Sequence, residues 1–329
     1  MLLARPATNL PSARFSSVNS VFSVSSVVKI GSLVCDLMPH TFPHWFLLGA
    51  GNMGTLAAWY LTRAGHGVTV IRHDSPAPLE KTLRLPDGRQ QMLSLPVLDP
   101  AALPDHIDHL LVAVKTPYTH QAMAPLTDRL DTDSLVLRFQ NGLGALDGLL
   151  PAGCSALEAV TTSAVKGQHP DHAVVAENAT WLGGSNAPPA WFAALTEHWP
   201  DLHWQDDIRP RQWHKLVANA VINPLTALYD VPNGRISDDP ALREQATQLC
   251  EEADQVLRQL DPAWPGHSLD NVLTVARATA GNTSSMRADR QRGAPTEVDA
   301  INGWLVKQAD KLGLAVPANR KVVTALTAR

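Results

Sequence analysis

Three polar side chains recur at four-residue spacing in the apolar segment WHKLVANAVINPLTAL, residues 213–228. They are Lys215, Asn219 and Asn223. Positions i, i+4 and i+8 lie on one face of a helix, so an ammonium and two carboxamides would line up along one side. Burying such groups without hydrogen-bond partners costs several kcal/mol of stability. We therefore expect these side chains either to find partners inside the protein or to face a ligand site.

Pro224 lies inside the same predicted helix. A proline there removes one backbone donor and leaves the carbonyl of Ala220, four residues earlier, without its helical partner. A bent helix with one polar face is typical of the wall of a substrate site. The alternative is a core helix in which the Lys215 ammonium reaches water along its stem and the asparagines bond locally. The segment alone leaves both interpretations open.

A glycine-rich turn indicates a dinucleotide site. The sequence GAGNMG, Gly49 to Gly54, lies between a predicted strand, WFLL, and a predicted helix, and a second predicted strand ends at Arg72. This strand–turn–helix–strand order is the context of a dinucleotide-binding fingerprint. Gly49 would permit the tight turn, Gly51 would let the backbone approach a pyrophosphate, and Gly54 would allow close packing of helix on strand. The helix N-terminus would offer N–H groups to the phosphates.

The end of the second strand indicates which dinucleotide binds. NAD sites usually place an acidic residue there, whereas NADP sites place an arginine that can bind the 2′-phosphate. Arg72 occupies this position, which favours NADPH/NADP+. Asp74 follows two residues later, so the strictness of the preference stays open.

Two further polar residues follow predicted buried strands. Lys115 comes directly after the strand over 109–114, and Asn141 follows the strand over 134–139. Ligands of open α/β sheets bind outside the carboxyl ends of the strands. Both residues are therefore candidates for cofactor contacts, although a solvated loop lysine and an Asn-Gly turn explain the same positions.

The chain divides into a strand-rich part and a helical part. We expect an α/β fold, with an N-terminal Rossmann-type dinucleotide-binding domain over 38–207 and an all-α substrate domain over 208–329. Strand signals stop after Arg211, and the stretch 200–210 is interpreted as the link between the domains. Further strands are predicted as a hairpin over 81–98 around Pro86-Asp87-Gly88, a strand and turn over 156–164, and a strand pair over 174–183. Further helices are predicted over 241–260, 269–280 and 297–312, and from Ala318.

The sequence of the helical part predicts two local details. The acidic residues of EEAD, 251–254, are placed on the solvent face of the helix predicted over 241–260. Thr296 is a suitable N-cap for the helix predicted to begin at Glu297.

The composition is that of an ordinary globular protein. Of the 329 residues, 45% are hydrophobic and 18% charged, with a net charge of −4. This balance does not favour nucleic acid or a membrane surface as a partner, and no apolar run has the length of a membrane span. Cys35, Cys154 and Cys250 form neither a metal spacing nor a disulfide framework, which indicates a reducing, cytoplasmic location and no metal.

Residues 1–37 differ from the rest of the chain. They are rich in Ser and Val and hold no acidic residue before Asp36. This composition fits an organelle transit peptide, or a translated stretch ahead of a start at Met38. The second interpretation is favoured, and we expect little fixed structure in either case.

From Met38 to the C-terminus the chain resembles the ketopantoate reductase (2-dehydropantoate 2-reductase) family. The motifs that carry the resemblance are GAGNMG, VKT at 114–116, QNGLG at 140–144, TTSA, WHKLVANAVINPLTAL, PNG, NTSSM and TEVDAINGWLV. The resemblance implies NADPH-dependent reduction of 2-dehydropantoate to (R)-pantoate, a step toward pantothenate and coenzyme A. It also implies a helical domain like the C-terminal domain of 6-phosphogluconate dehydrogenase.

The resemblance implies a role for each matching residue. Lys215 would donate the proton, and Glu297, near the nicotinamide and Lys215, would help to keep that lysine charged. Substrate binding would involve Asn141, Lys215, Asn219, Asn223, Asn233 and Ser285, with Asn282 and Asp289 as weaker candidates. Cofactor binding would involve Gly49, Ala50, Gly51, Asn52, Met53, Gly54, Arg72, Lys115, Asn141, Glu297 and a backbone contact at Val165.

Three alternatives stay open. A related NADP-dependent reductase of another branched 2-oxo acid would show the same motifs, and a dinucleotide sensor without catalysis would keep the glycine turn. An opine-type or 6-phosphogluconate-type dehydrogenase would share the architecture but use other catalytic residues. The substrate is expected to be a small 2-oxo acid, and the protein either a monomer or a homodimer.

Overall fold

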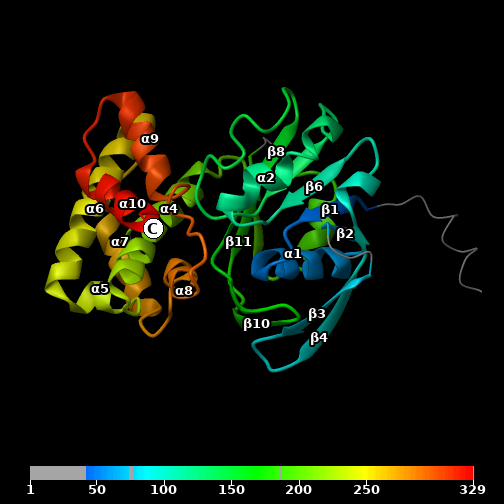
Figure 1. Ribbon diagram of the computed structural model, residues 1–329, viewed down its shortest axis with the longest axis horizontal. Helices are drawn as coiled ribbons and strands as arrows, with labels where there is room; N and C mark the ends of the chain where they lie inside the picture. The colour runs from blue at the N-terminus through cyan, green and yellow to red at the C-terminus, as the bar shows by residue number, and fades with distance from the viewer. Residues whose placement is uncertain (1–41, 74–76, 185–186, 329) are drawn as a thin grey trace, which may run out of the picture. The chain divides into compact units, whose positions relative to one another are not determined.

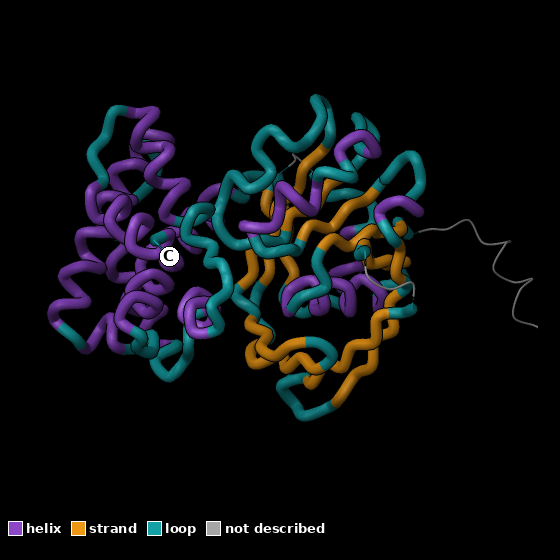
Figure 2. Tube along the Cα trace, viewed as in Figure 1, coloured by secondary structure: helices purple, strands orange, loops and turns teal. Residues whose placement is uncertain are grey.

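The computed structural model describes residues 42–73, 77–184 and 187–328. The expectations for residues 1–37 and for Asp74 lie outside these ranges. Every strand of the described chain lies before Arg209, and from Arg209 onward the described elements are helices. Figure 2 shows the orange strands gathered in one part of the molecule and a purely helical part beside it. The expected α/β fold, a Rossmann-type sheet followed by a helical half, is confirmed (Figure 1).

The larger sheet has eight strands in the order β12-β11-β8-β7-β6-β1-β2-β5. Every neighbouring pair is parallel except β8 and β11. Its central strands are short, nearly continuous apolar runs, as expected where both faces of a parallel sheet are covered. The strands are β1 (His44–Leu48), β2 (Gly67–Ile71), β5 (Val97–Leu98), β6 (His109–Val112), β7 (Leu135–Arg138), β8 (Ser155–Thr161), β11 (Thr180–Gly183) and β12 (Leu202–Gln205).

A smaller sheet, not expected from the sequence, has the order β4-β3-β10-β9. The predicted hairpin supplies β3 (Leu79–Arg84) and β4 (Gln90–Leu95), and Gly88 in its turn has a φ of 85°. The other strands are β9 (Ala164–Gln168) and β10 (Asp171–Ala176). The prediction that residues 174–183 form a strand pair was wrong, because β10 pairs with β3 and β9 whereas β11 pairs with β8 and β12. Strand partners are chosen by long-range packing, which local alternation does not report.

Helix α1 (Asn52–Arg63) contacts β1 and β2 of the large sheet and β9 of the small sheet. One apolar core joins its side chains to both sheets, including Trp45 and Leu47 from the large sheet and Leu83 and Leu95 from the small one. The glycine turn at the start of α1 is therefore held from two sides. Short helices fill the remaining connections: η1 (Pro100–Ala102), η2 (Thr116–Tyr118), α2 (Thr119–Met123), η3 (Thr127–Arg129) and α3 (Phe192–Thr196).

The helical half is built around α4 (Arg209–Tyr229), which packs against the helices α5, α6, α7, α8 and α10. Its apolar side chains form the centre of a second core. The surrounding helices are α5 (Arg235–Asp238), α6 (Pro240–Leu260), α7 (Ser268–Ala278), α8 (Ser285–Gln291), α9 (Asn302–Leu312) and α10 (Pro317–Thr327).

Three local expectations are corrected. The stretch 200–210 is not simply a link, because it contains β12 at the edge of the large sheet and the start of α4. Asp254 does not lie on a solvent face: it is buried and accepts hydrogen bonds from Trp264 Nε1 (2.8 Å) and Ser268 N (3.0 Å). These partners lie ten and fourteen residues away, so the period of α6 alone could not reveal them.

The third correction concerns the helix predicted to begin at Glu297. The helix α9 begins at Asn302, and residues 297–301 form turns closed by hydrogen bonds such as Gly303 N to Val298 O (2.9 Å). Thr296 is therefore not its N-cap. The Glu297 carboxylate instead accepts hydrogen bonds from two residues of the sheet half, Thr116 and Asn141.

Candidate functional site

The glycine turn has the geometry that its three glycines predict. Gly49 has a φ of 104°, and a Cβ there would lie 2.4 Å from Val114 N. A Cβ on Gly54 would lie 2.0 Å from Gly49 O, so only glycine lets α1 start this close to β1. A Cβ on Gly51 would meet no protein atom within 4 Å. The turn is therefore closely packed against protein at Gly49 and Gly54 but open at Gly51, where a ligand's phosphates could approach the backbone.

Three polar segments meet at the carboxyl edge of the large sheet. The strands β7, β6 and β1 are neighbours and parallel, so their ends lie along one edge. The glycine turn follows β1, Lys115 follows β6 after three residues, and Asn141 follows β7 after three residues. The sequence therefore placed these candidates correctly at one edge.

Lys115 forms an ion pair with Asp289 of α8. The Asp289 side chain is 2% exposed and also accepts a hydrogen bond from Arg292 Nη2 at 2.7 Å, whereas the Lys115 side chain is 41% exposed. The pair ties the sheet edge to the helical half and leaves part of the lysine accessible to a ligand.

Glu297 is buried and is held by the same sheet edge. Its Oε1 accepts a hydrogen bond from Thr116 N at 3.2 Å, and its Oε2 accepts one from Asn141 Nδ2 at 3.1 Å. Burial raises the pKa of Glu297, while the bonds from Asn141 and Thr116 and the charge of Lys115 oppose that rise. The backbone reinforces the contact, since Leu143 N donates to Ala300 O at 2.8 Å.

Lys215 is half-buried on α4, and its ammonium has no hydrogen bond or ion pair within the described residues. The pKa of Lys215 is lowered to about 8, mainly by burial and also by the charge of Arg138, while the charge of Glu297 opposes this shift. The side chain is thus an ammonium poised to release its proton near neutral pH, with a carboxylate near enough to influence it.

The two asparagines that share a face with Lys215 also lack internal partners. Asn219 is half-buried and Asn223 is buried, and across residues 42–73, 77–184 and 187–328 neither side-chain amide makes a hydrogen bond. Of the two explanations that the sequence left open, local bonding of these amides therefore does not hold. Three polar side chains on one helix face with no protein partner require water or a ligand.

The remaining substrate candidates lie on two turns beside α4. Asn233 is buried, and its Nδ2 donates to Thr279 Oγ1 at 3.0 Å, while its Oδ1 has no partner in the described chain. Asn282 is exposed, and its carbonyl accepts from Asn233 N at 3.1 Å. Ser285 is exposed at the start of α8, whereas the neighbouring Ser284 is buried and bonded to Thr226 Oγ1 at 2.7 Å.

The other cofactor candidates lie around the glycine turn. Arg72 is half-buried just beyond β2, and its backbone N donates to Leu98 O at 3.0 Å. Ala50, Asn52 and Met53 lie within the turn and the start of α1. Val165 lies in β9 of the small sheet, opposite Val174 of β10. The roles of all these residues stay predictions.

Sequence reasoning missed two groups that the structure brings to the site. The Thr116 backbone N–H binds Glu297, which no side-chain pattern could show. Arg138 is buried at the end of β7, pairs with Glu158 at 2.6 Å and donates to Gly142 O at 2.8 Å. It thereby supports the turn that carries Asn141. A buried charged residue at the end of an apolar strand was the available signal.

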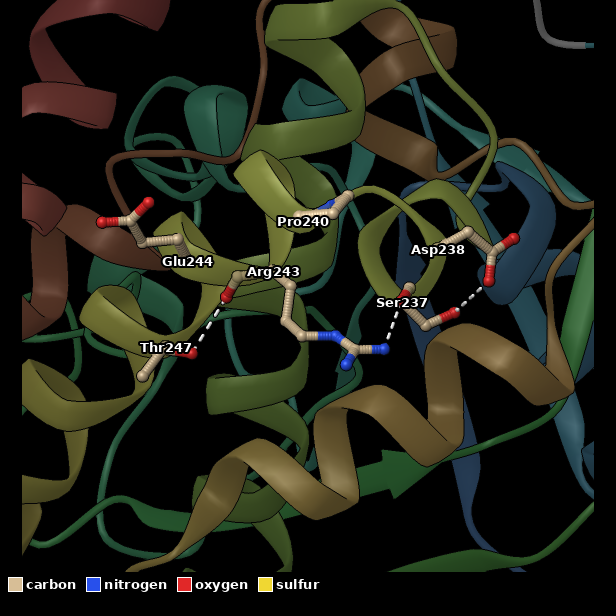
Figure 3. A pocket seen from close by; sticks show the side chains of 6 residues that line it. All are labelled: Ser237, Asp238, Pro240, Arg243, Glu244 and Thr247. Atoms are coloured by element: carbon tan, nitrogen blue, oxygen red, sulfur yellow. Dashed lines mark hydrogen bonds between the residues drawn. The ribbon is translucent and has the colours of Figure 1, made fainter.

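A pocket of about 340 Å³ lies at the junction of α5 and α6, and none of the predicted site residues lines it (Figure 3). Its polar groups are largely bonded to one another: Arg243 donates to Ser237 O, Ser237 Oγ donates to Asp238 Oδ1 at 3.1 Å, and Thr247 Oγ1 donates to Arg243 O at 2.9 Å. It therefore presents little unsatisfied polarity to a ligand.

The described residues contain no group of three or more His, Cys, Asp or Glu side chains arranged to hold a metal ion. Among the same residues, every helix is too short or too polar to span a bilayer.

The parallel sheet, the open glycine turn and the polar face of α4 define a Rossmann-type dinucleotide-binding protein with a helical second half. Comparison with known proteins gives the family. Residues 45–186 match the family described as "Ketopantoate reductase PanE/ApbA", and residues 207–329 match its C-terminal part. The chain belongs to the ketopantoate reductase family.

Individual relatives agree with this assignment. A 2-dehydropantoate 2-reductase from Shigella flexneri is 32% identical over 281 residues, which cover 84% of this chain and 91% of the relative. One from Archaeoglobus fulgidus is 31% identical over 284 residues, covering 84% and 94%. The crystal structure of a PanE/ApbA family ketopantoate reductase from Ralstonia eutropha JMP134 superposes with a TM-score of 0.75 at 25% identity, covering 86% of this chain and 97% of that one.

Proposed function

We propose that this protein reduces 2-dehydropantoate to (R)-pantoate with NADPH. The observation that carries the proposal is the unpartnered polar face of α4, formed by Lys215, Asn219 and Asn223, together with the buried carboxylate of Glu297 that influences Lys215. Family membership supports the same activity.

Lys215 is the proposed proton donor. When a hydride adds to a ketone, negative charge develops on the ketone oxygen, and an ammonium within hydrogen-bond reach stabilises that charge and supplies the proton. The pKa of Lys215, lowered to about 8 by burial, leaves the ammonium mostly protonated at neutral pH and able to give up its proton. Glu297 would favour the charged form of the lysine and limit this fall in pKa.

The chain fits an NADPH molecule at the glycine turn. The open side of Gly51 and the N-terminus of α1 suit the pyrophosphate, and Arg72 beyond β2 suits a 2′-phosphate. Lys115 and Asn141, at the ends of neighbouring strands, would hold the cofactor further along the sheet edge. When bound, NADPH would supply the hydride. The protein's own part is to align ketone and ammonium and to exclude water.

The substrate would lie between the polar face of α4 and the sheet edge. Its carboxylate and hydroxyl groups need hydrogen-bond partners, and Asn219, Asn223 and Ser285 offer groups that no described residue uses. Asn233 would contribute through its unpartnered Oδ1, since its Nδ2 is engaged with Thr279. A reductase of another branched 2-oxo acid would use the same partners for the carboxylate and the ketone.

The test is a spectrophotometric assay of NADPH oxidation with 2-dehydropantoate, repeated with NADH and with a panel of branched 2-oxo acids. We expect the highest kcat/KM for 2-dehydropantoate with NADPH. A higher kcat/KM for another 2-oxo acid would assign the protein to a related reductase. NADPH binding without turnover of any of them would indicate a sensor. A cytoplasmic location and a monomeric or homodimeric state stay predictions.

A further inference from the structure

Lys81 is a buried lysine that contacts the glycine turn and has no part in the proposed reaction. It lies on β3 of the small sheet and is 3% exposed. Its Nζ donates to Ala50 O at 2.9 Å and to His172 Nε2 at 3.2 Å. The His172 ring, from β10, bonds through Nδ1 to Asn52 Oδ1 at 2.7 Å. The small sheet thus holds the turn at two of its six residues.

The direction of these hydrogen bonds determines the protonation state of His172. An ammonium can only donate, so His172 Nε2 accepts, and Nδ1 carries the hydrogen that it donates to Asn52 Oδ1. His172 is then neutral. Burial, with the charge of Lys81, lowers the pKa of His172 to about 4, in agreement with this state. Asp171 and His169 also act on His172, with opposite signs.

Lys81 carries a charge that no described carboxylate offsets. No Asp or Glu oxygen of the described chain lies within 4.0 Å of its Nζ, and both of its partners are neutral. Burial, together with the positive charge of Arg72, lowers the pKa of Lys81 to about 8. A buried cation is costly unless an anion binds nearby. The glycine turn that Lys81 contacts through Ala50 O is the proposed pyrophosphate site, and Arg72, whose charge acts on Lys81, is the proposed 2′-phosphate site.

We propose that Lys81 is a positioning and specificity-determining residue for the phosphorylated cofactor. It fixes the Ala50 carbonyl beneath the turn, and its charge adds to that of Arg72 in favouring a dinucleotide with a 2′-phosphate over one without it. The inference rests on the proposed use of NADPH. It assigns to the small sheet, which local sequence patterns did not predict, a role in cofactor choice.

The test is equilibrium binding of NADPH and NADH, measured by fluorescence titration of the intact protein and its Lys81→Met and Lys81→Arg variants. We expect Lys81→Met to weaken NADPH binding by about tenfold, because it removes a buried positive charge that attracts the phosphates, and to weaken NADH binding clearly less. Lys81→Arg should restore most of the preference. Lys307→Met, which removes an exposed lysine on α9, serves as the charge-matched control. Equal losses for both cofactors, or no loss, would overturn the proposal.

A second measurement needs no variant. If the Lys81 charge selects the 2′-phosphate, the ratio of NADPH to NADH affinity in the wild-type protein should fall as pH rises from 7 to 9, because the lysine loses its proton near pH 8. An arginine side chain stays protonated in proteins, and His172, whose pKa burial and the charge of Lys81 lower to about 4, is already neutral. A constant ratio would overturn the proposal. Because binding is measured without turnover, failure of the proposed reductase activity would be seen separately, in the 2-dehydropantoate assay.

Discussion

The side-chain amide of Asn302 donates a hydrogen bond to the Ala220 carbonyl at 2.8 Å. This carbonyl is the one that Pro224 leaves without a helical partner, since proline has no N–H to offer four residues later. Asn302 is fully buried and its Nδ2 also lies 3.0 Å from Asn319 Oδ1. The first residue of α9 therefore completes the backbone of α4, the helix that carries Lys215.

We predict that Asn302→Ala lowers the free energy of unfolding by about 1–3 kcal/mol, because it leaves the Ala220 carbonyl buried and unpaired. In a Pro224→Ala background the new N–H at position 224 can bond to that carbonyl, so the same substitution should cost less. Urea denaturation of the four proteins of this double-mutant cycle measures the coupling. Additive effects of the two substitutions would show that Asn302 does not compensate for the proline.

Replacing Lys215 with Ala should remove the proton donor without removing the cofactor site. We expect kcat with 2-dehydropantoate to fall by about 10²–10⁴-fold, the range typical of general acid catalysis, while the Kd for NADPH changes little. The matched control is Lys307→Ala on the exposed side of α9, which should keep the wild-type kcat. A near-normal kcat for Lys215→Ala at saturating substrate would contradict the proposed role.

The pH dependence of kcat/KM should report the Lys215 ammonium. The proton donor must carry its proton in the free enzyme, so activity should be full well below pH 8 and should fall as pH rises through about 8. Glu297 raises the pKa of Lys215, so Glu297→Gln should move the alkaline limb to lower pH. Arg138 lowers that pKa, so Arg138→Met should move the limb to higher pH. We expect shifts of about one pH unit in opposite directions.

The two variants act as controls for each other. Both remove a buried charge, so a general loss of structure would lower kcat/KM in both without moving the limbs apart. Shifts in the same direction, or an alkaline limb that survives in Lys215→Ala, would mean that another group titrates.

The sequence predicted those parts of the site that depend on local spacing or on the ends of strands. The i, i+4, i+8 pattern placed Lys215, Asn219 and Asn223 on one face of α4 correctly. Parallel strand order then placed Lys115 and Asn141 at the edge that carries the glycine turn. These features follow from the period of a helix and the direction of a strand, and both can be predicted from a single segment of sequence.

Features that depend on contacts between distant segments were not predicted. Asn302 looked like an ordinary helical residue, because its partner Ala220 lies 82 residues earlier. Lys81 looked like a hairpin residue, although it reaches Ala50, 31 residues away, and His172, 91 residues away. The start of α9 was misplaced because Glu297 bonds to Asn141, 156 residues earlier, rather than to its own helix. Tertiary partners decide such cases over local propensity.

Substitution by alanine should affect NADPH binding at Gly51 and the free energy of unfolding at Gly54. A Cβ on Gly51 meets no protein atom within 4 Å, and its φ of −75° suits any residue. Gly51→Ala should therefore keep the wild-type free energy of unfolding but place a methyl group where the pyrophosphate would approach, and weaken NADPH binding by about tenfold or more. Chemical denaturation and a fluorescence titration with NADPH measure the two effects.

Gly54→Ala should instead destabilise the fold before any cofactor binds. Its Cβ would lie 2.0 Å from the Gly49 carbonyl oxygen and 3.2 Å from the Ala113 Cβ, so backbone must move. Such overpacking costs about 1–3 kcal/mol or more.

The Gly51→Ala variant decides whether the turn binds the pyrophosphate. If Gly51→Ala bound NADPH as well as the wild type, the turn would not be the pyrophosphate site, because the methyl group would then occupy space that the cofactor does not use.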